Sequence, residues 1–392
     1  MPPLVAIVAN VQTPYRVHLH RRIVREMPEI SLASVYTHDQ ADQPWESAEF
    51  AEINPVPFGR GQPVVEQGRA KWARADWAKG GRIMRWARER GVRAMVVGGY
   101  NDPTRLRLIG ACARAGIPCF VSADSNVHGD LARGWRRAVK SALVRWVVGR
   151  ATGLMPCGTL GVRYFERYGG DPSRMFFFPY EPDYDLIRDI SAERVGAALA
   201  RHGLESSRRR AVVCARLIGI KRVDLAIDAF AAIAGERPDL DLVVIGDGPM
   251  RAGLESRVPA GLRQRVIFTG FIGDQGEISA IYRGSDLLLC PSDYEPWAVV
   301  LNEAAAAGLA IVASEVVGAA AELVRDGVNG FTFPVGDLAA LTDRLRRATE
   351  AAVLPRLREG SGAVLAAWRE RGDPVLGLRR ALAFAGVLPR SA

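Results

Sequence analysis

The sequence predicts an α/β protein built from two doubly wound units. Short apolar runs rich in β-branched residues alternate with helical stretches along the whole chain, which is the pattern of parallel sheets covered on both faces. The 392 residues exceed one ordinary core and suit two domains. Apolar residues make up 48% and charged residues 24% of the chain, which indicates a globular protein rather than a tail or a fibre.

Each half contains its own set of predicted strands. Those of the first half are residues 4–10, 31–37, 94–99, 118–123 and 175–180. Those of the second half are residues 211–216, 240–248, 266–271, 286–292, 309–314 and 330–335. Prolines and acidic residues interrupt the periodicity at 178–191. We therefore expect an N-terminal domain at 1–185, a C-terminal domain at 186–372 and a separate terminal segment at 373–392.

The net charge and the cysteines indicate which partners and which cellular compartment to expect. The net charge of +9 lies mostly in the first half, with 27 basic and 19 acidic residues before Ser191. General arginine richness for solubility and an anionic membrane or substrate are both open as explanations, and no nucleic-acid partner is expected. The start of the chain lacks the pattern of a signal peptide, so we expect a cytoplasmic protein. Reduced thiols are expected at Cys112, Cys119, Cys157, Cys214 and Cys290.

Polar motifs follow three predicted strands of the second half. Ligands of open α/β sheets sit at the carboxyl ends of the strands, so these positions are candidates for a site. Arg216 and Lys221 follow the first of these strands, the turn that begins at Gly246 follows the second, and Glu295 follows the fourth.

The stretch "SDYEPWAVVLNEAAAAGLAIVAS" (292–314) combines two glutamates with a predicted helix. Proline is tolerated at the first helical position, so the helix should open at Pro296 and end at Gly308. Glu295 would then lie on the preceding loop and Glu303 inside the helix. The free backbone N–H groups at the helix start would form an anion site at Trp297, Ala298 and Val299.

Together these residues describe a ligand with sugar hydroxyls at both ends and phosphates in the middle. Carboxylates accept hydrogen bonds from paired hydroxyls, and Arg216 and Lys221 supply charge for a diphosphate. A nucleotide-sugar has this chemistry. Each residue alone has an ordinary alternative, because a lone glutamate is usually solvated and Arg216 and Lys221 could pair with Asp224 or Asp228.

The chain resembles the family 4 glycosyltransferases of the GT-B fold over essentially its whole length, most clearly from about 211 to 338. The resemblance rests on "ARLIGIKRVD", "VIGDGP", "VIFTGFI", "IYRGSDLLLCPS", "EPWAVVLNEAAAAGLAIVAS" and "VRDGVNGFTFPVGD". It implies two Rossmann-like domains that face each other across a cleft, with a nucleotide-sugar as co-substrate and no other cofactor. It leaves UDP, GDP and dTDP unresolved, and it implies that the segment 375–386 crosses back onto the first domain.

Family motifs imply roles for individual residues. Glu295 and Glu303 match the family's E-x7-E pair, in which the first contacts the transferred sugar and the second holds the ribose hydroxyls. Arg216 and Lys221 match the basic pair that neutralises the diphosphate. The base would lie against Gly270, Phe271 and Ile272.

The chain also departs from the family pattern. Glycines that usually follow the first glutamate are Pro296 and Ala298 here, which puts the identity of the donor sugar in doubt. The usual glycine pair after the first strand is replaced by "VQTPYR", where Arg16 would take over part of the phosphate contact; a "TPYR" start occurs in one subgroup of the family.

The resemblance implies a metal-independent, retaining transfer of a hexosyl-type sugar to a hydroxyl acceptor, either a polysaccharide or glycolipid or a precursor of secondary metabolism. The acceptor should contact strand ends of the first domain. Asp124 is the favoured proton acceptor or hydroxyl anchor, and a helix cap is the alternative role. The further acceptor candidates are Tyr15, Tyr100, Asn101, Ser125 and His128.

Residues 131–150 form a predicted basic amphipathic helix with tryptophans. One side carries Leu131, Trp135, Val139, Leu143, Trp146 and Val147. Such a helix can lie on an anionic membrane at the inner face. Packing on the core with a solvated basic face is the favoured alternative. The oligomeric state is not predicted.

Three rival functions share part of this sequence pattern. A dinucleotide-dependent oxidoreductase needs GxGxxG between the first strand and the first helix, and "VANVQTPYR" lacks it. Another GT-B reaction, such as a sugar-nucleotide epimerase or a sugar phosphorylase, uses the same two-domain cleft and stays open. A catalytically inactive nucleotide-sugar binding protein also stays open, because Ala298 departs from the family pattern.

Overall fold

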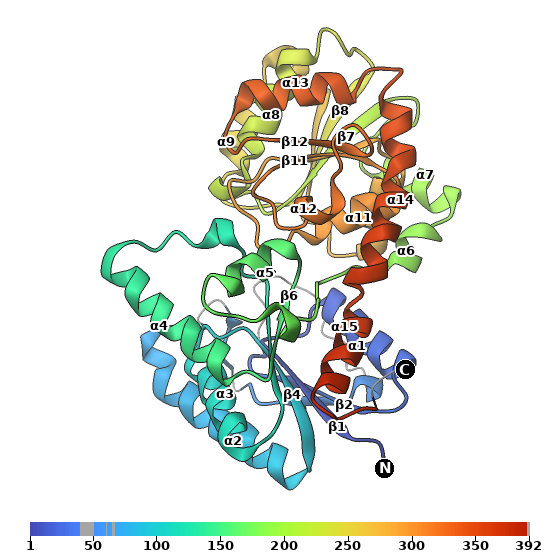
Figure 1. Ribbon diagram of the computed structural model, residues 1–392. Coiled ribbons are helices and arrows are strands. Elements are labelled where there is room, and N and C mark those ends of the chain that lie inside the picture. Colours follow the sequence, from blue (N-terminus) through green and yellow to red (C-terminus); the bar gives the residue numbers. More distant parts are fainter. Residues whose placement is uncertain (40–50, 60, 65–66, 390–392) are drawn as a thin grey trace. The chain divides into compact units, whose positions relative to one another are not determined.

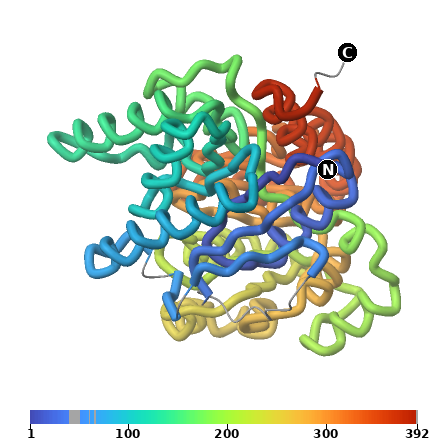
Figure 2. The backbone as a smooth tube through the Cα atoms, turned by 90° about the horizontal axis from the view of Figure 1, so that it is seen from below, coloured from blue at the N-terminus to red at the C-terminus, as the bar shows by residue number. Residues whose placement is uncertain are grey.

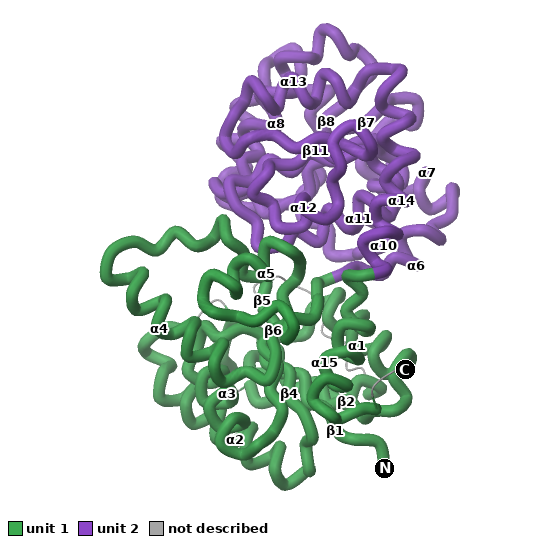
Figure 3. Tube along the Cα trace, viewed as in Figure 1, with its two compact units in different colours: residues 1–180, 371–392 green, residues 181–370 purple. Residues whose placement is uncertain are grey.

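The computed structural model describes residues 1–39, 51–59, 61–64 and 67–389. The chain divides into two compact units, residues 1–180 with 371–392 and residues 181–370 (Figure 3). The sequence placed these divisions at 185 and 373. Each unit holds one six-stranded parallel sheet with helices around it, so the prediction of two doubly wound units is confirmed (Figure 1).

Unit 1 has the strand order β3-β2-β1-β4-β5-β6, and all strands are parallel. The strands are β1 Leu4–Ala9, β2 Ser31–Tyr36, β3 Pro55–Pro57, β4 Val92–Gly98, β5 Cys119–Ala123 and β6 Gly153–Pro156. Its main helices are α1 Pro14–Glu26, α2 Ala73–Glu89, α3 Pro103–Ala115, α4 Gly134–Arg150, α5 Thr159–Glu166 and α15 Pro374–Phe384. Successive residues of β1 point to opposite faces, so Ala6 and Val8 join one core and Val5 and Ile7 the other.

Unit 2 has the strand order β12-β11-β10-β7-β8-β9. The strands are β7 Arg209–Cys214, β8 Leu240–Ile245, β9 Val266–Gly270, β10 Leu287–Cys290, β11 Ala310–Ser314 and β12 Gly330–Phe333. The helices are α6 Tyr184–Arg188, α7 Ala192–Arg201, α8 Val223–Ile233, α9 Arg251–Arg257, α10 Gln275–Arg283, α11 Val299–Ala307, α12 Ala320–Leu323, α13 Leu338–Ala348 and α14 Leu354–Gly372. The nearly continuous apolar strands are buried on both faces, as parallel sheets require.

The strands of unit 1 differ from the prediction at both edges of the sheet. The sequence missed β3 and β6, which have only three and four residues. Residues 175–180 do not form the predicted strand and make only partial contact with β6. Met175 forms a single bridge with Leu154, and Phe178 donates its N–H to Pro156 at 3.0 Å. Phe176 likewise donates its N–H to the Leu154 carbonyl at 3.0 Å, and β6 ends at Pro156, so it offers no further strand residue for pairing.

Helix α15 lies far from α1 in the sequence but packs beside it, as Figures 1 and 2 both show. Val375, Leu378 and Leu382 of α15 join the core formed by α1 and one face of the first sheet. Arg22 of α1 donates to Asp373 at 2.7 Å, directly before α15. Helix α15 therefore completes the core of unit 1.

Within the described residues, no helix combines the length and the apolar character that are needed to cross a bilayer.

Replacing Leu378 with alanine should destabilise unit 1 by about 2–5 kcal/mol, because the leucine is fully buried. Urea unfolding measures this loss. Leu131→Ala is the matched control, since Leu131 lies in the same unit and is 78% exposed, and it should change stability by less than about 0.5 kcal/mol. Equal effects of the two substitutions would show that α15 is not part of this core.

Candidate active site

Helix α11 begins at Val299, three residues after the predicted start at Pro296. Ala298 has a φ of 80°, in the left-handed region, which cannot continue into a right-handed helix. Trp297 and Ala298 thus lie on the loop before the helix, and the predicted set of helix-start N–H groups is wrong for these two residues. The end at Gly308 is confirmed, with a φ of 76°, and so are the loop position of Glu295 and the helical position of Glu303.

The loop that carries Glu295 is held by the segment after β11. Gly318 donates its N–H to the Glu295 carbonyl at 3.1 Å, and Ala319 donates to the Trp297 carbonyl at 2.8 Å. A Cβ atom at Gly318 would collide with the Pro296 carbonyl oxygen. Only glycine at 318 permits this close approach, so the path of the loop depends on a residue that the sequence analysis did not single out.

The Glu295 carboxylate contacts two side chains from strand ends. Lys221 Nζ forms an ion pair with Glu295 Oε1, and Ser292 Oγ donates to the same oxygen at 3.0 Å. Glu295 is only 9% exposed. The structure thus brings together two residues that the sequence proposed separately. A lysine ammonium has three donors, so Lys221 can hold Glu295 and still contact an anion.

Arg222 ties the Lys221 loop to the Glu295 loop. Its guanidinium donates to Asp293 at 2.9 Å, and the Asp293 N–H donates to the Ile220 carbonyl at 2.9 Å. Arg222 itself has a left-handed φ of 49°. This ion pair was not predicted from the sequence. Its residues stand out there only because they lie close to Lys221 and Glu295, which were predicted site residues.

The GDG turn after β8 supports the loop of Arg216. A Cβ at Gly246 would collide with the Ala215 carbonyl, and one at Gly248 would lie 2.6 Å from the Leu217 carbonyl. Gly246 also donates its N–H to the Gly270 carbonyl at 2.9 Å. These glycines let the ends of β7, β8 and β9 pack closely. Arg216 lies exposed at the end of β7.

The predicted base-binding segment follows the end of β9. Gly270 has a φ of 80°, Phe271 is 40% exposed and Ile272 is buried. Helix α10 starts shortly afterwards and presents Gln275 to Glu303. The segment therefore lies between the GDG turn and the second glutamate.

Glu303 is a buried carboxyl group in α11. It is 8% exposed and accepts a hydrogen bond from Gln275 Nε2 at 2.8 Å. Burial raises the pKa of Glu303 to about 7, although the contacts with Gln275 and Tyr282 oppose the shift. Burial likewise raises the pKa of the neighbouring Cys214 thiol to about 12, and the charge of Glu303 adds to this shift. Glu303 therefore exchanges a proton near neutral pH.

Unit 1 contains a cavity of about 280 Å³ at the ends of β1, β4 and β5. Five predicted residues line it: Arg16, Tyr100, Asn101, Asp124 and Ser125. Two further acceptor candidates do not line it. Tyr15 packs edge-on against Tyr180 with ring centroids 5.3 Å apart, and His128 donates its N–H to Asn126 at 2.9 Å.

Asp124 faces this cavity beside Arg16. Burial raises the pKa of Asp124, and the positive charge of Arg16 opposes this shift. The Arg16 guanidinium donates to Asn10 and, at 2.9 Å, to the Val11 carbonyl. The alternative role of Asp124 as a helix cap is filled by Asn126, which accepts from the N–H groups of His128 and Gly129.

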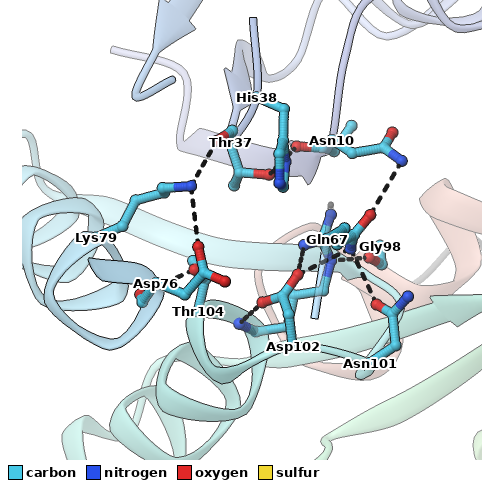
Figure 4. A network of polar contacts seen from close by, with 12 residues as sticks. Asn10, Thr37, His38, Gln67, Asp76, Lys79, Gly98, Asn101, Asp102 and Thr104 are labelled. Carbon is cyan, nitrogen blue, oxygen red and sulfur yellow. Dashed lines mark hydrogen bonds and ion pairs between the residues drawn. The ribbon is translucent and has the colours of Figure 1, made fainter. Parts of the chain in front are cut away.

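Several residues of a buried polar network also line the cavity, among them Asn10, Gln67 and Asn101 (Figure 4). Asp102 and Arg105 form an ion pair in which both side chains are 1% exposed, and Arg105 also donates to the Gly98 carbonyl. Gln67 donates to Asp102 at 2.8 Å and to Asn101 at 3.0 Å. The sequence analysis missed Asp102, although an Asp-Pro pair before a helix is a recognisable start signal.

Comparisons with known proteins agree with this arrangement. The family model described as "Glycosyl transferases group 1" matches residues 208–351. The chain is 36% identical over 263 residues to a 2-deoxystreptamine glucosyltransferase of Streptomyces kanamyceticus, covering 66% of this chain and 67% of that protein. It is 33% identical over 177 residues to an alpha-D-kanosaminyltransferase of the same organism, covering 45% of this chain and 44% of that protein.

The fold is shared with solved glycosyltransferase structures. The crystal structure of Anabaena HepE with UDP and glucose matches with a TM-score of 0.72 at 17% identity and covers 98% of this chain and 100% of that one. The two units therefore form the GT-B fold. The chain belongs to the group 1 glycosyl transferases, within the family 4 type. It nevertheless spans only 44%, 32% and 14% of three other curated relatives.

The raised pKa of Glu303 predicts a pH-dependent stability. Between its ordinary value of 4.5 and about 7, the folded protein holds a proton that the unfolded chain releases, so stability should fall as the pH rises through this window. The full shift corresponds to about 3 kcal/mol. Urea unfolding at pH 5 and pH 8 should show Glu303→Gln gaining about 2–3 kcal/mol relative to the wild type, since part of the shift already acts below pH 5. If the stability difference between Glu303→Gln and the wild type were the same at both pH values, the raised pKa of Glu303 would be contradicted.

Proposed function

We propose that the protein is a retaining glycosyltransferase that moves a hexosyl-type sugar from a nucleotide-diphosphate sugar to a hydroxyl acceptor. The contact of Glu295 with Lys221 at the ends of β7 and β10 is the observation that carries this proposal. It joins a hydroxyl-binding carboxylate to a phosphate-binding cation within one unit. Family membership and the second buried carboxyl at Glu303 support it.

The donor would bind along the strand ends of unit 2. Glu295 accepts hydrogen bonds from the sugar, Arg216 and Lys221 contact the diphosphate, and Glu303 accepts from the ribose hydroxyls. The backbone near Gly246 and the start of α11 add N–H donors. The base lies against Gly270, Phe271 and Ile272.

Transfer would proceed through a loose, oxocarbenium-like transition state without a metal ion. Arg216 and Lys221 stabilise the charge that develops on the leaving diphosphate, which is the electrostatic part of the catalysis. The diphosphate takes the proton of the attacking hydroxyl on the face from which it leaves, so the anomeric configuration is retained. Asp124 anchors the acceptor hydroxyl as a hydrogen-bond acceptor, while the proton goes to the diphosphate.

A small polyhydroxylated acceptor fits unit 1 best. Its cavity of about 280 Å³ is lined by Asn10, Asn101, Ser125 and Asp124, which offer both donors and acceptors to hydroxyl groups. The similarity to a 2-deoxystreptamine glucosyltransferase supports this class over a polymer. The donor base stays open among UDP, GDP and dTDP.

The alternatives make different predictions about products. An epimerase would convert the nucleotide-sugar without an acceptor alcohol, and a phosphorylase would transfer the sugar of a glycoside to inorganic phosphate. An inactive nucleotide-sugar binding protein would bind the donor and change nothing. Product analysis therefore distinguishes the three functions.

A panel of UDP-, GDP- and dTDP-sugars tests the proposal. We expect one donor to raise the melting temperature and to be transferred to a cyclitol or amino-cyclitol acceptor with retention, also in EDTA. Glu295→Gln and Arg216→Ala should lower kcat/KM on the order of 100-fold. Glu359→Gln is the control, since Glu359 is exposed in the same unit, and it should leave kcat/KM unchanged. Failure of every donor to bind or react would overturn the proposal.

Pro296 and Ala298 should set donor preference, because they border the Glu295 loop where relatives carry glycine. Glycine at 298 also removes backbone strain of about 1 kcal/mol or more. We expect Pro296→Gly with Ala298→Gly to change the ratio of kcat/KM values between two donor sugars. Ala307→Gly, at the far end of the same helix, is the control. An unchanged ratio would assign donor choice to other residues.

We also propose peripheral contact of residues 131–139 with an anionic membrane. The predicted apolar side of this helix is divided in the structure. Val147 is buried and Leu143 and Trp146 are half-buried, whereas Leu131, Trp135 and Val139 are 78%, 72% and 60% exposed next to Arg136 and other basic residues. Exposed tryptophan beside arginine suits the membrane interface.

Co-sedimentation with vesicles tests this contact. The protein should bind vesicles of phosphatidylglycerol more strongly than neutral ones, and Trp135→Ala with Val139→Ala should reduce the binding. Val328→Ala changes another exposed valine, in unit 2, and should have no effect. Absence of binding to anionic vesicles would remove this proposal.

A further inference from the structure

A second cavity of unit 1 lies between α2 and α3 and has a volume of about 390 Å³. It shares no lining residue with the cavity that holds Asp124. Its lining is dominated by guanidinium groups, with one carboxylate and a small apolar part. The residues are Gly81, Met84, Arg85, Arg88, Glu89, Arg107, Ala111 and Arg114.

The positive charge of this cavity has little internal compensation. Helices α2, α3 and α4 together carry thirteen Lys and Arg residues against two Asp and Glu. Among the residues that the structure describes, no carboxylate pairs with Arg85, Arg88 or Arg114. Four guanidinium groups around one cavity repel one another, and a bound anion would remove this repulsion.

Surface arginines of unit 2 behave differently. Arg208 pairs with Asp241 at 2.7 Å, Arg257 pairs with Asp228 at 2.5 Å, and Arg346 pairs with Glu236 at 3.0 Å. Carboxylate partners are thus available to many surface arginines of this arginine-rich chain, whereas Arg85, Arg88 and Arg114 have none among the described residues.

Arg107 is held in place before any ligand binds. Its Nη1 donates to the Trp77 carbonyl at 2.7 Å, and its guanidinium carbon lies 5.1 Å from the centroid of the Trp77 ring. A Cβ at Gly81 would lie 2.8 Å from that carbon, so the glycine lets the guanidinium lie flat against α2. The remaining N–H groups of Arg107 are free to donate. A fixed guanidinium loses little entropy on binding.

We propose that the cavity between α2 and α3 binds a ligand through its phosphate groups, independently of glycosyl transfer. Phosphate oxygens accept paired hydrogen bonds from guanidinium groups, which makes arginine the usual residue for this ligand. The volume lies within the range of about 300–1,000 Å³ of small-molecule sites, so a phosphorylated small molecule or a lipid headgroup fits. Such a site would account for part of the net positive charge in the first half of the chain.

Pyrophosphate is the probe for a calorimetric titration of the full-length protein in 0.15 M NaCl. Arg88→Ala with Arg114→Ala should weaken binding at least tenfold, and Gly81→Ala should weaken it by displacing Arg107. Arg74→Ala is the matched control, because Arg74 is exposed on the same helix outside the cavity, and it should change the affinity less than twofold.

The donor site also suits a diphosphate, so each titration is repeated in the Arg216→Ala background. Loss of pyrophosphate binding with Arg216→Ala alone, and not with the double substitution in the cavity, would overturn the proposal. Equal weakening by Arg74→Ala would also overturn it, because it would show non-specific attraction. Competition by vesicles of phosphatidic acid would assign the phosphate to a headgroup, and its absence to a soluble compound.

Discussion

The close approach of Gly318 to the Pro296 carbonyl fixes the part of unit 2 on which its chemistry depends. It leaves no room for a side chain at 318, and hydrogen bonds from Gly318 and Ala319 bind the loop at 295–297 to the segment after β11. Ala298 adopts a left-handed conformation at the end of this loop, and α11 then starts with Glu303 on a buried side. Strained backbone of this kind persists only where surrounding contacts determine it, and it gathers at functional sites.

Much of the fold was predictable because its signals are local. The strands of unit 2 are continuous apolar runs, and the glycine at 308 ends its helix as expected. The start of α11 was not predictable, because Pro296 satisfies the local rule for a first helical residue. The contacts of Gly318 with the loop override that rule, and they join residues more than twenty positions apart.

In the candidate site, too, single residues could be predicted from the sequence but their contacts could not. The sequence identified Glu295 and Lys221 as separate candidates at strand ends. It did not show that they touch, because their contact depends on the pairing of β7 with β10. Arg222 with Asp293 and Gln275 with Glu303 were missed for the same reason. In unit 1, the Asp-Pro pair at 102–103 signals a helix start, but the ion pair of Asp102 with Arg105 and the place of Arg105 in the cavity lining depend on the folded arrangement.

Lys221 has two roles. It neutralises Glu295 in the ligand-free protein, and in the proposed reaction it also stabilises the diphosphate. Burying Glu295 without Lys221 would leave an uncompensated charge, and removing Glu295 would leave the lysine without its anchor. The two side chains should therefore act as a unit rather than as independent contacts.

A double-mutant cycle tests this most directly. Lys221→Met, Glu295→Gln and the double variant are compared with the wild type by their affinity for the nucleotide-sugar that gives the largest thermal shift. We expect a coupling energy above about 1 kcal/mol, with the double variant little weaker than either single one. Losses that add within about 0.5 kcal/mol would contradict a joint Glu295–Lys221 donor site.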